Sequence, residues 1–411
     1  MNVLLLNYDF PPNPGIGGRR WAKLAKAMAQ QGHTIHVVKA EFPVGAEPSS
    51  WAEDVNHENI NITSAPRNYP KAISHPVASL WGKIKFHIHK QLLKLKESGT
   101  IYDQSIGWDS TAMPICRNIL NQHNIDTIIA TGAPWNLLVY AARLKKEFPG
   151  CNLLIDYRDP WLTARNYGMA NLSGSRKKAE EAKQSFVFEQ ADFVCTPYAY
   201  LTEQLSQWSS LHCAHQPAFH TLEHFFDPSD FSTLQTTRKE DAVFRVVYAG
   251  DAYIGSEPQW QELQRIIQAI TAENKGRINI QFDLYTTAKL PAFMSTIPNV
   301  HAYAPIGKSI FNIMQQADVL LIVLPENKKN ERTTKFFEYL PFRKPLLVVA
   351  PLGEVTNYIE SNQLGVHSNQ SLPIIQSLFN GDYAAHSFNS SFDLSCETNV
   401  YRTQQMMEML S

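Results

Sequence analysis

The sequence has few cysteines and no long apolar stretch. Its five cysteines are spread over 411 residues without a C-x-x-C pair, so it carries no zinc or disulfide-exchange motif. Such cysteine usage suits a reducing compartment. No run reaches the roughly 18 apolar residues of a membrane span, and the first residues lack the basic and apolar regions of a signal peptide. We therefore expect a cytoplasmic protein.

An excess of charge of either sign is also missing. Lys and Arg number 37 and Asp and Glu number 38, which gives a net charge of −1 and no support for nucleic-acid binding. Hydrophobic residues make up 44% and aromatic residues 11% of the chain, unlike the polar, aromatic-poor composition of disorder. The length suits two or three folded domains, at roughly 100–200 residues each.

Several motifs of enzymatic chemistry do not occur. There is no D-x-D, no H-E-x-x-H, no G-x-S-x-G and no G-x-x-x-x-G-K sequence. Their absence argues against metal-dependent transfer, zinc hydrolysis, serine hydrolysis and nucleotide hydrolysis, because these motifs usually mark such enzymes. We expect neither a metal ion nor a cofactor.

Short apolar segments alternate with segments of helical periodicity along most of the chain, which is typical of a parallel α/β sheet covered on both faces. Strands are predicted at Val3–Leu6, Thr34–Lys39, Thr127–Thr131, Asn152–Tyr157, Phe193–Thr196, Phe244–Ala249, Asn279–Tyr285, Val319–Leu324 and Leu346–Ala350. The pattern predicts two doubly wound, Rossmann-like domains facing each other across a cleft. Their expected bounds are 1–215 for the first domain, 216–242 for a linker, 243–392 for the second domain and 393–411 for a C-terminal helix.

Candidate binding residues follow the first predicted strand of the chain and the strand Val319–Leu324. Gly17 and Gly18 precede a helix, where free N–H groups receive an anion. A glycine turn needed only for backbone geometry is the alternative. Thr333 and Thr334 stand at another expected helix start, and Glu338 lies one turn beyond Thr334, placed to accept hydrogen bonds from ribose hydroxyls. An ordinary helix cap with a solvated glutamate is the alternative.

Basic residues gather around the same segment. A departing nucleoside diphosphate needs positive charge, and we select Arg332 and Lys335 for that role, although charge runs are commonly solvated surfaces. In the first domain Arg158 and Asp159 follow a strand, and Asp159 is placed to orient or deprotonate an acceptor hydroxyl. A purely structural Asp–Arg pair is the alternative, and Trp135 either stacks on a sugar or belongs to the core.

The residues resemble a known family. The stretch "LLLNYDFPPNPGIGGRRWAKLAKAMAQQGHTIHVV" is similar to the first unit of glycosyltransferase family 4, also called glycosyl transferases group 1, of the GT-B fold, through Gly17-Gly18 and Gly32-His33. "ADVLLIVLPENKKNERTTKFFEYLPFRKPLLVVAP" resembles the family's donor-site region, where Glu338 matches the second Glu of an E-x7-E element. The chain departs from the family in lacking a basic residue in "YAGDAYIGSEPQW" and a His after the strand Asn152–Tyr157.

The resemblance implies an enzyme that moves a sugar from a nucleotide-diphosphate sugar to a saccharide or lipid-linked acceptor. It further implies retention of anomeric configuration, no metal, and a place in bacterial-type surface polysaccharide or glycoconjugate synthesis. Asp159, Arg158 and Lys335 would be catalytic, and the nucleotide sugar would be bound by Gly17, Gly18, Arg332, Thr333, Thr334 and Glu338. A sugar-nucleotide 2-epimerase of related fold and a non-catalytic nucleotide-sugar-binding subunit remain as alternatives.

The segment 80–96, "LWGKIKFHIHKQLLKLK", predicts a basic amphipathic helix. Leu80, Ile84, Ile88, Leu92 and Leu95 form one apolar stripe flanked by lysines, while Phe86 and Leu93 project from the opposite face. Such a helix is typical of peripheral contact with the inner face of a membrane, and the resemblance agrees with this, since several relatives act on lipid-linked acceptors. A helix packed on the core, with lysines extending to solvent, is the alternative.

Overall fold

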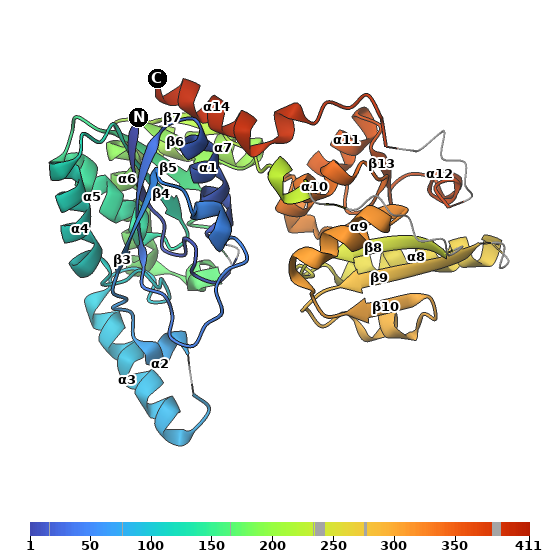
Figure 1. The fold of residues 1–411 in the computed structure, drawn as a ribbon. Helices are drawn as coiled ribbons and strands as arrows, with labels where there is room; N and C mark the ends of the chain where they lie inside the picture. Colours follow the sequence, from blue (N-terminus) through green and yellow to red (C-terminus); the bar gives the residue numbers. More distant parts are fainter. Residues whose placement is uncertain are drawn as a thin grey trace. The chain divides into compact units, whose positions relative to one another are not determined.

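A computed structural model describes residues 1–15, 17–75, 77–164, 166–232, 234, 243–274, 278–379 and 388–411. The chain divides into two compact units (Figure 1). Unit 1 comprises Met1–Glu223 together with Thr403–Ser411, and unit 2 comprises His224–Arg402. The division falls inside the expected linker, whose residues 235–242 lie outside the described residues.

Unit 1 contains a seven-stranded sheet in the order β3-β2-β1-β4-β5-β6-β7, with every neighbouring pair parallel. Its strands are β1 (Asn2–Leu6), β2 (Thr34–Ala40), β3 (Ile60–Ala65), β4 (Thr127–Gly132), β5 (Asn152–Tyr157), β6 (Phe193–Thr196) and β7 (Ala218–Thr221). The two edge strands, β3 and β7, were not predicted, and β7 lies in the expected linker. Both are partly exposed and polar, so they lack the apolar run that marks the central strands.

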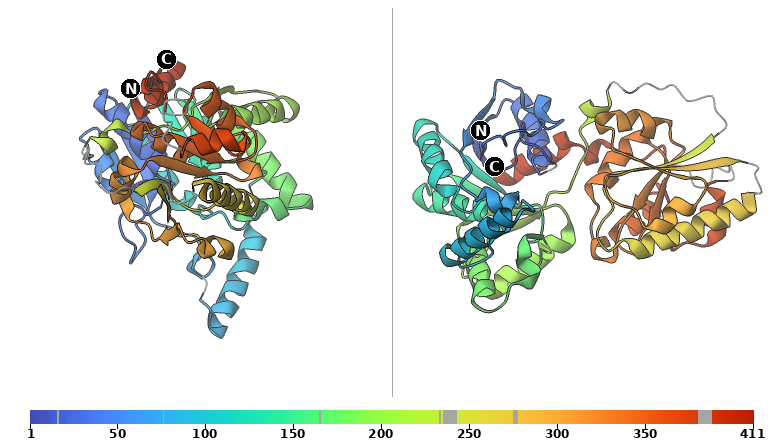
Figure 2. Two further views of the ribbon diagram at one scale, coloured as in Figure 1. Left: turned by 90° about the vertical axis from the view of Figure 1, so that its right-hand side faces the viewer. Right: turned by 90° about the horizontal axis from the view of Figure 1, so that it is seen from below.

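Helices cover both faces of this sheet (Figures 1 and 2), which explains why the consecutive residues Val3–Leu6 of β1 are all buried. They are α1 (Arg19–Gln30), α2 (Lys71–Ser74), α3 (Leu80–Lys96), α4 (Asp109–Gln122), α5 (Asn136–Glu147), α6 (Gly174–Gln190) and α7 (Ala199–His212), with the 3-10 segments η1 (Ala52–Val55) and η2 (Asn166–Asn171). Helix α14 (Asn399–Leu410) begins in unit 2 and ends in unit 1. It lies within residues 393–411, where a C-terminal helix was predicted.

Unit 2 contains a six-stranded parallel sheet in the order β10-β9-β8-β11-β12-β13. The strands are β8 (Val243–Ala249), β9 (Asn279–Tyr285), β10 (Val300–Tyr303), β11 (Val319–Val323), β12 (Leu346–Val349) and β13 (Gly365–His367). The helices are α8 (Glu257–Asn274), α9 (Ile310–Gln316), α10 (Thr334–Tyr339), α11 (Glu354–Ser361) and α12 (Leu372–Ser377), with 3-10 segments η3 (Pro228–Phe231), η4 (Ala292–Thr296), η5 (Gly307–Ser309), η6 (Glu326–Lys328), η7 (Leu340–Phe342) and η8 (Ser395–Glu397).

The strand order places a topological switch point in each sheet. In unit 1 the chain turns from one side to the other between β1 and β4, and in unit 2 between β8 and β11. Open α/β sheets bind ligands beyond the carboxyl ends of the strands at such points. The predicted architecture of two doubly wound units is confirmed, and each unit has one edge where a ligand site is expected.

Candidate functional site

The unit 2 switch point is dominated by the side chain of Lys335. It starts on α10 and reaches the loop that follows β8, where its Nζ donates hydrogen bonds to the Tyr248 hydroxyl at 2.6 Å and to the Asp251 carbonyl at 2.8 Å. The ammonium also lies 4.1 Å from the centre of the Tyr248 ring. Gly250, at φ 112°, leaves room for it, because a Cβ there would come within 2.5 Å of Lys335 Cε. The loop that lacks a basic residue thus receives one from α10.

Burial lowers the pKa of Lys335 to about 7, while the carboxylates of Asp251 and Glu338 act in the opposite direction. The residue is only 9% exposed. Its hydrogen bonds go to neutral oxygens, so the ammonium is poorly compensated. A buried cation of this kind gains stability from any anion that enters the site.

Two other predicted residues lie beside the same loop. Thr333 is buried and directly precedes α10, and it lies near Tyr253, whose pKa burial raises to about 12. Glu338 is half-buried and close enough to Lys335 and Tyr253 to affect the pKa of both. Thr334 is the first residue of α10. Thr333, Lys335 and Glu338 are therefore brought together around the β8–α8 loop.

The helix that carries them is shorter than predicted. The sequence pattern predicts a helix over Arg332–Leu340, whereas the structure has a six-residue helix, Thr334–Tyr339, continued by the 3-10 segment η7. Pro341 within η7 lacks an N–H group and limits continuation of the α-helix. A helix this short has a small dipole, so the charge available at this edge comes mainly from Lys335.

Arg332 does not join this group. Its guanidinium lies 3.5 Å from a Glu354 carboxylate oxygen, 3.8 Å from one of Glu397 and 4.0 Å from the centre of the Tyr358 ring. Glu397 in turn accepts a hydrogen bond from the Tyr358 hydroxyl at 2.8 Å. Arg332 therefore ties η8 to α11, a role in packing that the sequence did not reveal. Two further basic side chains of the cluster, Lys328 and Lys329, have carboxylate partners of their own.

In unit 1 the predicted residues meet at the carboxyl ends of the adjacent strands β1, β4 and β5. Arg158 donates a hydrogen bond to the Gly17 carbonyl at 2.6 Å and lies 3.3 Å from Asp159. A Cβ on Gly17 would come within 3.0 Å of Arg158 Nη1, and a Cβ on Gly18 would overlap the Asp9 carbonyl. Close packing therefore accounts for both glycines, whereas an anion-binding role for them stays a prediction.

Asp9 is the residue that the sequence analysis missed. It lies in the loop after β1, separated from the strand by Asn7 and Tyr8. Its carboxylate lies next to Gly17, and its pKa is raised by burial against the opposing influence of Arg67 and Arg158. Its position in the sequence could have identified it, because it is the first acidic residue after a buried strand at the switch point. Asp159, by contrast, has a side chain that is 50% exposed.

Other polar and aromatic residues near this edge have structural partners. Asp156 is fully buried in β5 and accepts hydrogen bonds from Trp21 Nε1 at 2.7 Å and the Thr131 hydroxyl at 2.9 Å. Trp135 is fully buried and stacks on Trp161 with ring centres 5.6 Å apart. The structure thus decides between the two interpretations of Trp135: it belongs to the core.

Asp103 was not predicted either. Its Oδ2 accepts the backbone N–H groups of Trp135 at 2.6 Å and Asn136 at 2.9 Å. These N–H groups begin α5, so the chain's own carboxylate occupies the site where this helix could hold an anion.

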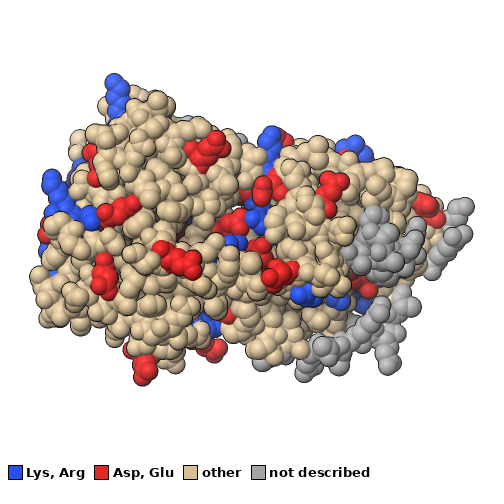
Figure 3. Space-filling model, turned by 90° about the horizontal axis from the view of Figure 1, so that it is seen from above, with Lys and Arg blue, Asp and Glu red and all other residues tan. Residues whose placement is uncertain are grey.

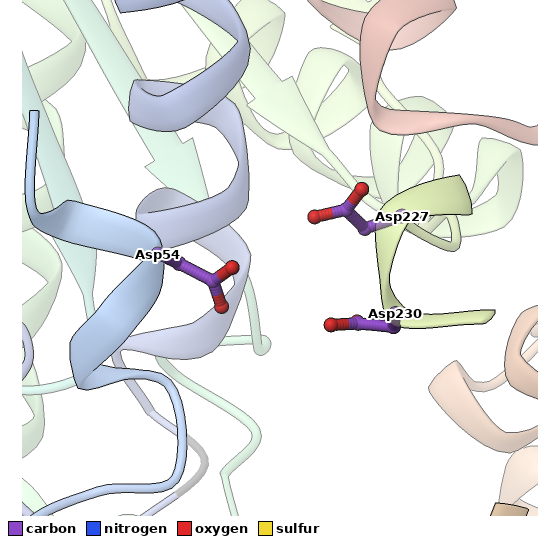
Figure 4. Close-up of side chains that lie close together, drawn as sticks. All are labelled: Asp54, Asp227 and Asp230. Carbon is purple, nitrogen blue, oxygen red and sulfur yellow. The ribbon is translucent and has the colours of Figure 1, made fainter. Parts of the chain in front are cut away.

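The acidic residues drawn in Figure 4 also have partners within their own units. In unit 1, Asp54 of η1 pairs with Lys23 at 2.8 Å and Lys26 at 3.0 Å. In unit 2, Asp227 accepts the Ser229 N–H at 3.0 Å, and Asp230 lies 4.0 Å from Lys308. Acidic and basic side chains are interspersed on the face shown in Figure 3. Chemistry without a metal remains a prediction.

No protein-family model and no curated protein sequence matches the chain, but solved structures do. α,α-Trehalose 6-phosphate synthase from Burkholderia multivorans matches with a TM-score of 0.58 and 10% identity, over 100% of this chain and 96% of that one. WaaG, a glycosyltransferase involved in lipopolysaccharide biosynthesis, matches at 0.55 with 14% identity, over 100% and 99%. UDP-GlcNAc 2-epimerase from Methanocaldococcus jannaschii matches at 0.50 with 8% identity, over 100% and 99%.

At sequence identities of 8% to 14%, the similarity to these solved structures establishes the fold alone. The chain has the GT-B fold, built from two Rossmann-like units with parallel sheets of seven and six strands. Among the residues that the structure describes, no helix is both long enough and apolar enough to span a bilayer.

Proposed function

We propose that this chain is a glycosyltransferase that moves a sugar from a nucleotide-diphosphate sugar, bound by unit 2, to an acceptor hydroxyl bound by unit 1. Glycosyltransferases among the proteins of similar fold support the reaction class. The acceptor would be a saccharide or a lipid-linked saccharide, in surface polysaccharide or glycoconjugate synthesis. The membrane contact expected through residues 80–96 would be made by helix α3, a surface separate from the residues proposed to bind the sugar nucleotide and the acceptor.

The observation that carries this proposal is Lys335. A sugar leaves a nucleotide when the bond from its anomeric carbon to the diphosphate breaks, and the negative charge on the departing oxygen then grows. A buried ammonium at the switch point, hydrogen-bonded to the Tyr248 hydroxyl and the Asp251 carbonyl, is placed to neutralise that charge. Because its pKa is about 7, the protonated form would be favoured as soon as a diphosphate is bound.

Glu338 and Thr333 fit the rest of such a substrate. A carboxylate accepts hydrogen bonds from two adjacent ribose hydroxyls, and Glu338 is half-buried beside Lys335, with its carboxylate near the loop. The Thr333 and Thr334 hydroxyls offer hydrogen bonds to phosphate oxygens. These roles assign sugar-nucleotide binding to α10 and the β8–α8 loop. Arg332, which is held by Glu354 and Glu397, is left out of them.

The acceptor side rests on the group around Arg158. Asp159, half-exposed and paired with Arg158, would orient the acceptor hydroxyl. Asp9 is a second candidate for accepting its proton, since burial favours the neutral acid and so raises its basicity. As the new bond forms between the acceptor oxygen and the anomeric carbon, the hydroxyl proton passes to one of these carboxylates or to the departing diphosphate.

The first test is a thermal-shift screen of the full chain with UDP, GDP, ADP, CMP and dTDP sugars. A ligand at about 100 times its dissociation constant adds roughly 2.7 kcal/mol of apparent stability. We expect a shift with one nucleotide family, lost in Lys335→Met and Glu338→Gln. Arg265→Met is the matched control, because it removes a cation that is 71% exposed on α8 of the same unit. No shift with any nucleotide, or an unchanged shift in Lys335→Met, would refute the proposed site.

Product analysis then separates the candidate reactions. A transferase consumes the sugar nucleotide only when an acceptor is present, whereas a 2-epimerase converts it without one, an alternative favoured by the fold shared with UDP-GlcNAc 2-epimerase. A non-catalytic binding subunit yields no product. NMR of the anomeric proton in the product tests retention of configuration, and full activity in the presence of a chelator tests independence from metal.

A further inference from the structure

Helix α3 exposes its main apolar stripe to solvent. Phe86 and Leu93, from the smaller apolar face, pack instead against Tyr69, Ile73, Ile101 and Ile106. At about 100° per residue, their direction is roughly 180° from the middle of the stripe. The helix therefore packs on unit 1 through its smaller apolar face, and the stripe itself is not packed on the core. The exposed fractions are 74% for Leu80, 73% for Trp81, 40% for Ile84, 52% for Ile88, 49% for Leu92 and 85% for Leu95.

Lysines border this stripe on both sides. On the helical projection Lys83 and Lys94 lie along one edge and Lys85 and Lys96 along the other, and all four are exposed. The segment from Leu80 to Lys96 contains no acidic residue. The outward face of α3 is therefore an apolar strip between two rows of positive charge.

The helix is held firmly on unit 1 before anything binds it. Ser79 caps its first turn by accepting the Gly82 N–H at 3.1 Å. At the other end Arg176 of α6 donates hydrogen bonds to the carbonyls of Lys94 at 2.8 Å, Glu97 at 3.2 Å and Gly99 at 2.6 Å. Helices α2 and α3 extend away from the sheet of unit 1 (Figures 1 and 2). The stripe is thus preformed and accessible.

We propose that α3 lies in the surface of a bilayer containing anionic lipids, with its apolar stripe among the acyl chains and its lysines at the headgroups. The charge pattern selects this partner, because lysines on both edges meet negative headgroups in a plane, whereas two copies of α3 would bring like charges together. Trp81 at the start of the helix suits the boundary between headgroups and acyl chains. This surface lies outside the candidate site, so the inference does not depend on sugar transfer.

The test is cosedimentation of the full chain with vesicles. Phosphatidylcholine vesicles in which phosphatidylglycerol is about a third of the lipid are compared with pure phosphatidylcholine vesicles. We expect binding to the anionic vesicles that weakens as salt is added. Trp81→Ser with Leu95→Ser should lower the partition coefficient at least about tenfold, and Lys85→Gln with Lys96→Gln should lower it for anionic vesicles by a similar factor.

Control variants change exposed residues elsewhere on unit 1. Leu211, 79% exposed on α7, and Val44, 97% exposed, are changed to Ser together, and exposed Lys178 is changed to Gln. These variants should bind vesicles like the parent chain. Since all altered side chains face solvent, the far-ultraviolet circular dichroism should be unchanged in every case.

Three results would overturn the inference. The first is no binding to anionic vesicles, and the second is binding that the α3 variants leave intact. The third is a dimer of the parent chain in light scattering that becomes monomeric in Trp81→Ser with Leu95→Ser, which would assign the stripe to a second copy. Thermal shifts with nucleotide sugars should be the same in all α3 variants, so failure here is distinct from failure of the proposed function.

Discussion

Lys335 should make the stability of unit 2 depend on pH in a defined direction. In the unfolded chain a lysine keeps its proton up to its ordinary pKa of about 10.4, whereas burial lowers the pKa of folded Lys335 to about 7. Between these values the unfolded state binds more protons than the folded state. The free energy of unfolding therefore rises with pH across this window, and below it the full cost of the buried charge is present.

The magnitude follows from the two pKa values. The gain approaches about 1.4 kcal/mol per pH unit once the folded lysine is neutral, which amounts to about 2 kcal/mol between pH 7 and pH 9. For a unit of this size that corresponds to a rise of roughly 4–8 °C in Tm. Lys335→Met keeps much of the side-chain volume but cannot titrate, so the parent chain should gain this amount relative to the variant over that range.

The assay is calorimetric unfolding of the parent chain and Lys335→Met at half-unit pH steps, with Arg265→Met as the control. Carboxyl and phenol groups ordinarily titrate outside pH 7–9, so the difference between parent and Lys335→Met isolates the lysine. Arginine stays protonated in both states, and the Arg265→Met difference should not change with pH. A difference that stays constant for Lys335→Met as well would refute the reasoning from burial.

Three further predictions concern binding and packing. Affinity for the nucleoside diphosphate should fall by up to about tenfold per pH unit above pH 7, because Lys335 loses its proton there. Titration calorimetry in buffers of different ionisation enthalpy should show that a proton is taken up on binding. An affinity independent of pH would contradict this prediction. Asp103→Ala should cost about 2–3 kcal/mol and lower Tm, because it leaves the first N–H groups of α5 without their acceptor; an unchanged Tm would exclude that cap as a stabilising contact. Gly18→Ala should cost about 1–3 kcal/mol because its Cβ would overlap the Asp9 carbonyl, whereas Gly150→Ala, with open space around it, should be nearly neutral; equal effects of the two would refute the packing argument.

The central strands were predictable because they are apolar on both faces. Five strands of unit 1 were assigned to within about a residue, since a parallel strand between two helical layers has few polar positions to interrupt its apolar run. Edge strands β3 and β7 keep polar residues because one side of each is open. Whether a strand is covered on both sides therefore explains why the central strands were predicted and why β3 and β7 were missed.

The candidate site was less predictable because its contacts join distant parts of the chain. Lys335 was selected from the sequence as a positive charge beside the expected binding edge, but its burial and its contact with the β8–α8 loop were not predictable, because that contact depends on Gly250, 85 positions earlier. Arg332 was assigned to the same edge, yet Glu397, 65 positions later, holds it elsewhere. Helix α3 shows a related difficulty: periodicity revealed two apolar faces, but only the neighbouring segments decide which one packs.

Helix α6 contacts both the C-terminal end of α3 and Trp161, which follows β5. Arg176 holds the C-terminal end of α3, and Glu180, one turn further along α6, accepts hydrogen bonds from Trp161 Nε1 at 2.8 Å and the Thr100 N–H at 2.8 Å. Trp161 closes the short loop that carries Arg158 and Asp159. Helix α6 therefore fixes the distance between this loop and α3. A membrane surface that bound α3 would therefore meet the loop carrying Arg158 and Asp159 at a fixed distance and angle, so the helical framework of unit 1 sets how far this loop stands from that surface.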